Sequence, residues 1–140
     1  MTDGGLKNIY KSAMPDVHWQ PIETWSTGQG VPDVEYCFPG GHSGWIENKH
    51  TTGWQVKFEP HQVAWLERRS RLGGRCFVAV RRHCPAGPRR GPAVDEFWLF
   101  HGSKARLLIK NKMQAADAID IFHHGPTNWN WSLIRKYLTQ

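Results

Sequence analysis

The sequence lacks several features that would place it at once in a large class of proteins. No run of about 18 consecutive apolar residues occurs, so we expect no transmembrane helix. The first ten residues, MTDGGLKNIY, contain no apolar signal-peptide core, which predicts an intracellular, cytoplasmic protein (in the host cytoplasm if the source is viral). The 3 cysteines, Cys37, Cys76 and Cys84, are odd in number and lack metal-ligand spacing, which favours free thiols over disulfides or zinc. No internal repeat or low-complexity segment is present either.

The composition is typical of one small globular domain. The 140 residues suffice for one modest core, and 39% of them are hydrophobic, with 8 tryptophans. The net charge of +6 is unevenly distributed. Most of the 18 basic residues lie between Arg68 and Lys112, where Asp95 and Glu96 are the only acids. Such a stretch would attract phosphate groups, although a solvated basic surface is an equal alternative.

The central motif lies between residues 30 and 49, GVPDVEYCFPGGHSGWIENK. Residues 34–38 and 45–48 are rich in β-branched and aromatic types and predict two strands. The segment between them contains a proline and three glycines, which are turn formers. The stretch therefore predicts a β-hairpin with a glycine-rich tip.

The hairpin predicts that three charged side chains meet. Asp33 precedes the first strand, while Glu47 and Lys49 lie two positions apart on the second. Because side chains alternate along a strand, Ile46 should face the core, and Glu47 and Lys49 should share the other face. Two carboxylates in one small area repel each other unless a hard cation joins them, and oxygen ligands suit Mg²⁺ or Mn²⁺. A lysine beside them can orient a water or neutralise a phosphate, which indicates metal-assisted phosphodiester hydrolysis.

The next segments predict a helix and a central strand. Glu59 and Pro60 mark a helix start and Gly73 marks its end. Gln62 would project from the first turn toward the strand with Glu47 and Lys49. There its amide can donate to a water or phosphate and accept a hydrogen bond from the lysine. The alternative is an ordinary glutamine at the start of a helix, with no role in the site. Residues 76–80 are continuously apolar, which predicts a central strand reached by a right-handed crossover.

The remaining segments of the chain predict mainly secondary structure. We expect a short helix or a frayed arm over residues 1–15, an extended segment over 18–25, a loop passing over the site at 51–58, a loop at 83–92, a strand at 94–100, and helices at 103–109, 113–122 and 132–138. Trp129 and Trp131 should pack internally, with a dimer seam or a nucleobase as alternatives.

The motifs occur in an order that resembles a known family. Gly-Val-Pro-Asp at 30–33, Ile-Glu-x-Lys at 46–49, Pro-x-Gln at 60–62 and Val-Arg-Arg at 80–82 resemble the PD-(D/E)xK nucleases, in particular small standalone members of the VRR-NUC branch. The resemblance covers roughly residues 23–100. It implies an α/β (α+β) single domain with a restriction-endonuclease-like core, a mixed β-sheet flanked by helices. The expected boundaries are an N-terminal arm at 1–16, a nuclease core at 17–110 and a packed helical extension at 111–140.

The resemblance also implies a function. Asp33, Glu47 and the backbone carbonyl of Asn48 would hold Mg²⁺ or Mn²⁺, with Glu23 as a further candidate ligand or an ordinary surface acid. Lys49 and Gln62 would join the acids as catalytic residues. The DNA-binding candidates are Arg81, Arg82, Arg89, Arg90 and Lys57, although a solvated Lys57 is the more common case. The expected activity is a metal-dependent endodeoxyribonuclease, acting as a homodimer on branched DNA such as Holliday junctions. The alternatives are a less selective nickase or end-processing nuclease on duplex DNA, and a DNA-binding module that no longer cuts.

Overall fold

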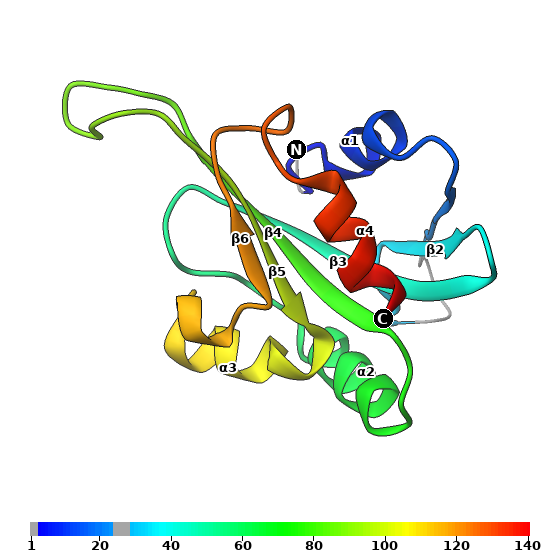
Figure 1. The fold of residues 1–140 in the computed structure, drawn as a ribbon. Coiled ribbons are helices and arrows are strands. Elements are labelled where there is room, and N and C mark those ends of the chain that lie inside the picture. The colour runs from blue at the N-terminus through cyan, green and yellow to red at the C-terminus, as the bar shows by residue number, and fades with distance from the viewer. Residues whose placement is uncertain (1–2, 24–28) are drawn as a thin grey trace.

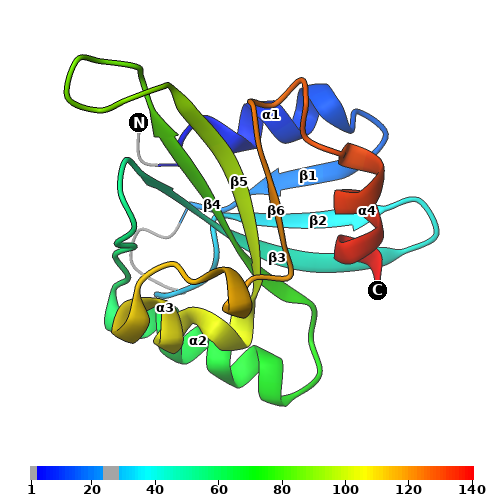
Figure 2. The same cartoon turned by 60° about the vertical axis from the view of Figure 1, so that its left-hand side comes forward.

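A mixed β-sheet forms the centre of the chain in the computed structural model, which describes residues 3–23 and 29–140. Its six strands follow one another in space in their sequence order (Figures 1 and 2). They are β1 (His18–Pro21), β2 (Val34–Phe38), β3 (His42–Thr51), β4 (Cys76–Cys84), β5 (Val94–His101) and β6 (Asp120–Phe122). Neighbouring strands are antiparallel except β3 and β4, which are parallel.

Helices cover both faces of the sheet, which makes the chain a single small α+β domain with two apolar cores. Figures 1 and 2 show α1 (Leu6–Ala13) and α4 (Trp131–Thr139) on one face, and α2 (Pro60–Arg71) and α3 (Ala105–Asn111) on the other. Short 3₁₀ turns at Gly102–Lys104 and Ala115–Asp117 complete the regular structure of the described residues. None of the helices in this part of the chain is long and apolar enough to cross a membrane.

Strand periodicity explains how the sheet divides its side chains. Ile46 is fully buried in the core beneath α1 and α4, and its neighbour Glu47 points to the opposite face. Residues 76–80 of β4 are all buried because helices lie on both sides of this strand. The predicted hairpin, the predicted helix after Pro60 and the parallel connection from β3 through α2 to β4 are therefore confirmed.

The start of α2 is fixed by local hydrogen bonds and by one glycine. The Glu59 backbone amide donates to Oε1 of Gln62 at 2.9 Å, which forms part of a capping box, and Pro60 occupies the first turn. Gly30 has a φ of 84° and lies so close to His61 that a Cβ atom there would overlap its backbone carbonyl. This contact places the loop before Asp33 against the first turn of α2.

The structure also tests the other predicted strands and helices and the packing of Trp129. The strand at 94–100 and the helices at 103–109 and 132–138 are confirmed, with bounds that differ by a few residues. A short helix is confirmed at Leu6–Ala13, and Leu6 and Tyr10 are fully buried, so this part of the N-terminal segment is not a frayed arm. The extended segment is confirmed for β1, whereas Thr24 and Trp25 lie outside the described residues. Trp129 is 3% exposed, so its internal packing is confirmed.

One prediction was wrong. Residues 113–122 do not form a helix. After the short turn at Ala115–Asp117, residues 120–122 pair with the edge of β5 and form strand β6. Ile121 and Phe122 then pack on opposite faces of the sheet, as strand residues do. The loop predicted at 83–92 is confirmed with a later start, since His83 and Cys84 still belong to β4 and pair with Asp95 and Val94.

Candidate active site

The hairpin brings the two predicted carboxylates together. Val34 pairs with Ile46 across β2 and β3, which places Asp33 beside Glu47 one step further along. The backbone amide of Asn48 donates to Oδ2 of Asp33 at 2.9 Å. Glu47 is only 2% exposed, so one carboxylate is buried and the other lies next to it.

Lys49 and Gln62 complete a closed polar cluster with Glu47. Nζ of Lys49 lies 3.3 Å from Oε2 of Glu47 and donates to Oε1 of Gln62 at 3.0 Å. Nε2 of Gln62 donates to the same Glu47 oxygen at 3.0 Å. Because the capping hydrogen bond and Lys49 both need the amide oxygen of Gln62, its NH₂ group must point to Glu47. The predicted approach of Gln62 to the strand with Glu47 and Lys49 is confirmed.

The carboxylate pair is not fully compensated by protein groups. Burial raises the pKa of Glu47 to about 7, the charge of Asp33 adds to this, and Lys49 opposes it. Burial also raises the pKa of Asp33, against the opposing effects of the Asn48 amide and of Lys7 and Lys49. Oε1 of Glu47 is buried and has no hydrogen-bond partner among the described residues. A divalent cation that accepts this oxygen and the Asp33 carboxylate as ligands fits the site, because it would stabilise both charges.

The described residues contain no group of three or more His, Cys, Asp or Glu side chains placed to hold a metal ion. Glu23 is exposed and does not complete such a group with Asp33 and Glu47. A cation at this site would therefore take two carboxylates, with backbone oxygen and water or substrate oxygen for its other positions. This ligand set is common for Mg²⁺, which keeps several waters.

Tyr10 supports the site from the opposite face of the sheet, and the sequence did not predict this contact. Its hydroxyl donates to Oδ1 of Asn48 at 2.6 Å, and Nδ2 of the same asparagine is buried without a hydrogen-bond partner within the described chain. Burial, with the charges of Asp3 and Asp33, holds the pKa of the Tyr10 phenol well above its usual value, so the hydroxyl remains a donor. The helical spacing of Leu6 and Tyr10 predicted a packed helix, but no local pattern predicts a hydrogen bond 38 residues away.

The five predicted DNA-binding side chains fall into two groups. Arg81 makes a bidentate pair with Asp95 at 2.8 and 2.7 Å, and Arg82 pairs with Glu96 at 2.7 Å. These carboxylates neutralise both guanidinium groups, which leaves little free charge for a phosphate. The others remain exposed on the surface: Arg89 and Arg90 in the long β4–β5 loop that extends away from the domain (Figure 1), and Lys57 before α2.

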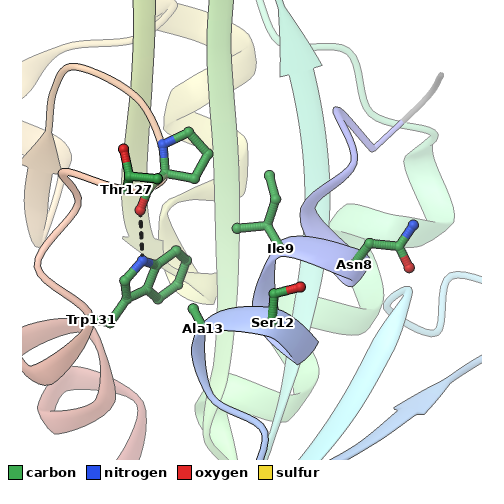
Figure 3. Close-up of a pocket in the computed structure, with 7 residues that line it drawn as sticks. Asn8, Ile9, Ser12, Ala13, Thr127 and Trp131 are labelled. Atoms are coloured by element: carbon green, nitrogen blue, oxygen red, sulfur yellow. Dashed lines mark hydrogen bonds between the residues drawn. The ribbon is translucent and has the colours of Figure 1, made fainter.

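A separate apolar pocket lies between α1 and the loop before α4 and has a volume of about 510 Å³. Figure 3 shows the Trp131 ring at one side, with its Nε1 donating to the Pro126 carbonyl at 2.8 Å, and Ile9 and Ala13 facing it from α1. The lining residues are Asn8, Ile9, Ser12, Ala13, Pro126, Thr127 and Trp131. None of these side chains is ionisable, so the pocket has no acid, base or metal ligand and is not a candidate for hydrolytic chemistry.

No family model matches the chain, and no curated protein matches it. A function for this protein therefore has to be inferred from the residues of the site.

Proposed function

We propose that this protein is a divalent-metal-dependent endonuclease that hydrolyses phosphodiester bonds in DNA. The observation that carries the proposal is the cluster of Asp33, Glu47, Lys49 and Gln62, in which Oε1 of Glu47 is buried without a hydrogen-bond partner among the described residues. Burial and the charge of Asp33 raise the pKa of Glu47, and burial raises that of Asp33; a cation bound between the two carboxylates would relieve both effects. Buried acids with perturbed pKa values beside a fixed lysine are typical of a reaction site.

Each residue has a distinct task in this proposal. Asp33, Glu47 and the backbone carbonyl of Asn48 would hold Mg²⁺ or Mn²⁺, which supplies Lewis-acid stabilisation of charge on the phosphate. Lys49 orients the attacking water, or donates to a phosphate oxygen as negative charge develops there. Gln62 holds the lysine and Glu47 at fixed positions through the 3.0 Å hydrogen bonds that it makes to each.

The order of the elements supports the same proposal. Asp33 immediately precedes β2, Glu47 lies on β3, Gln62 on α2 and the Val-Arg-Arg segment on β4, which is the order of the motifs that resemble the VRR-NUC branch of PD-(D/E)xK nucleases. On this basis we propose a restriction-endonuclease-like core, a homodimer and a preference for branched DNA. A two-fold dimer would present one site to each of two strands.

The proposal can be tested with purified protein on labelled linear, forked and four-way DNA, with Mg²⁺, with Mn²⁺ and with EDTA. We expect cleavage only with a divalent ion and fastest on four-way DNA; equal rates on linear duplex with the same arms would instead indicate the less selective nuclease. Asp33→Asn should abolish cutting and leave DNA binding in EDTA intact. Asp117→Asn, in the short turn at Ala115–Asp117 outside the cluster, is the matched control and should cut normally. Undiminished nicking by Asp33→Asn would remove these residues from the mechanism.

A further inference from the structure

Arginines of the described residues differ in how their charge is compensated. Four of them form ion pairs with acids: Arg81, Arg82, Arg106 and Arg135. Arg69 and Arg75 are also partly buried, yet neither has an Asp or Glu side chain within 4.0 Å in this part of the chain. A partly buried cation without a carboxylate is costly, and an anionic ligand would compensate it.

The Arg69 guanidinium is held in place by aromatic rings. It lies 4.4 Å from the centre of the Trp65 ring and 5.5 Å from that of Trp45. The Trp65 and Trp45 rings meet edge to face at 5.3 Å. Gly74 leaves space for the arginine, since a Cβ atom there would overlap its Cδ. The position of Arg69 is therefore set before any ligand binds.

Arg75 comes from the start of β4 and is fixed by carbonyl groups. Its Nε donates to the backbone oxygen of Gln140 at 3.1 Å and its Nη1 to the Ser43 carbonyl at 3.2 Å. Arg69 and Arg75 line the same polar pocket of about 610 Å³, together with Ser43, Trp45 and the acid Glu35. The Gln140 and Ser43 oxygens already satisfy donors of Arg75, so Arg69, which has no such partner among the described residues, carries the uncompensated positive charge of this pocket.

The pocket lies on the same side of the sheet as the candidate active site. Glu35 and Trp45 are paired across β2 and β3, two residues from Asp33 and Glu47 respectively, and so share their face. Two residues along a strand span about 7 Å. On α2, Arg69 follows Gln62 by seven residues, or about 10 Å along the helix axis.

We propose that Arg69 and Arg75 form a subsite for a backbone phosphate of the substrate strand. The 7–10 Å offset places the contacted phosphate about one or two phosphates from the scissile bond, because neighbouring phosphates of one strand lie further apart than the rise of about 3.4 Å along the helix axis. Arg69 presents its planar donors to the phosphate oxygens, and Arg75 adds a second positive charge. The inference rests on the proposed nuclease function for the identity of the ligand, whereas the anion site itself rests on the two arginines.

The test combines neutral phosphates with arginine variants. DNA carrying one uncharged methylphosphonate at each position near the cut is digested by the wild type and by Arg69→Met, a change that retains apolar packing on the tryptophans. For the wild type we expect one position, about one or two nucleotides from the cut, where the substitution slows cleavage about tenfold. Arg69→Met and Arg75→Met should cut natural DNA more slowly and lose sensitivity at that position only. Arg135→Gln, whose arginine pairs with Asp16, is the control for net charge and should retain the wild-type pattern.

A second measurement needs no DNA. Inorganic pyrophosphate is titrated into wild type, Arg69→Met and Arg69→Lys, and tryptophan fluorescence reports the rings beside Arg69. We expect a saturable change in the wild type, a weaker one with lysine and none with methionine. If the wild type cuts DNA but no methylphosphonate position depends on Arg69, the subsite is refuted and the nuclease function stands. If DNA is not cut but pyrophosphate binds through Arg69, the anion site stands and the nuclease function fails. If neither occurs, both fail.

Discussion

Replacing the buried carboxylate of Glu47 by an amide should make the metal-free protein more stable at neutral pH. A carboxyl whose pKa is raised by folding binds its proton more tightly in the folded state than in the unfolded state. The pKa of Glu47 is about 7, against an ordinary 4.5. The contribution of Glu47 to the stability of the wild type in EDTA should therefore fall as the pH rises from about 4.5 to about 7, and remain level above that. The difference between these pKa values corresponds to about 3 kcal/mol.

The assay is urea unfolding in EDTA at pH 5 and pH 8 for the wild type, Glu47→Gln and the control Glu35→Gln. Other titrating groups are common to all three proteins, so the difference in their pH dependence isolates Glu47. Between pH 5 and pH 8, the free energy of unfolding should fall by about 3 kcal/mol less for Glu47→Gln than for the wild type. Glu35→Gln should follow the wild type. Mg²⁺ at pH 8 should stabilise the wild type and leave Glu47→Gln unchanged. Parallel pH profiles for the wild type and Glu47→Gln would refute the argument that burial and Asp33 destabilise this carboxylate.

Two further predictions concern residues around the site. Tyr10→Phe removes the donor to Asn48 and leaves a buried amide unsatisfied, so urea unfolding should show a loss of about 1–3 kcal/mol; an unchanged midpoint would show that water satisfies the amide. Burial raises the pKa of Glu96, but hydrogen bonds from Arg82 and Trp98 outweigh this effect and lower the pKa overall. The ionised Glu96 therefore stabilises the fold above the ordinary pKa of a glutamate, and this stabilisation is lost as the pH falls through the lowered pKa. Glu96→Gln should therefore be less stable than the wild type at pH 7 and approach it in acid, and a constant difference at all pH values in thermal melts would contradict this ion-pair effect.

Local patterns in the sequence determined the hairpin and the elements that follow it. Strand alternation alone places Ile46 in the core and Glu47 on the other face, because neighbouring strand residues point in opposite directions. Pro60 and Gly73 determine the bounds of α2 through backbone preferences that need no tertiary partner. These signals act within a few residues, which is why the sequence predicted that Asp33, Glu47, Lys49 and Gln62 would meet.

Tertiary structure alone decided the features that depend on distant partners. Residues 113–122 have a spacing that also suits a helix, and the open hydrogen-bonding edge of β5 makes part of them a strand. Arg81 and Arg82 have the charge of DNA-binding residues, but their acids arrive from β5, 14 residues further along the chain. The raised pKa of Glu47 likewise comes from burial under α2 and from Asp33, which lies just before β2. Charge and burial depend on what surrounds a side chain in space, and a spacing pattern does not contain that information.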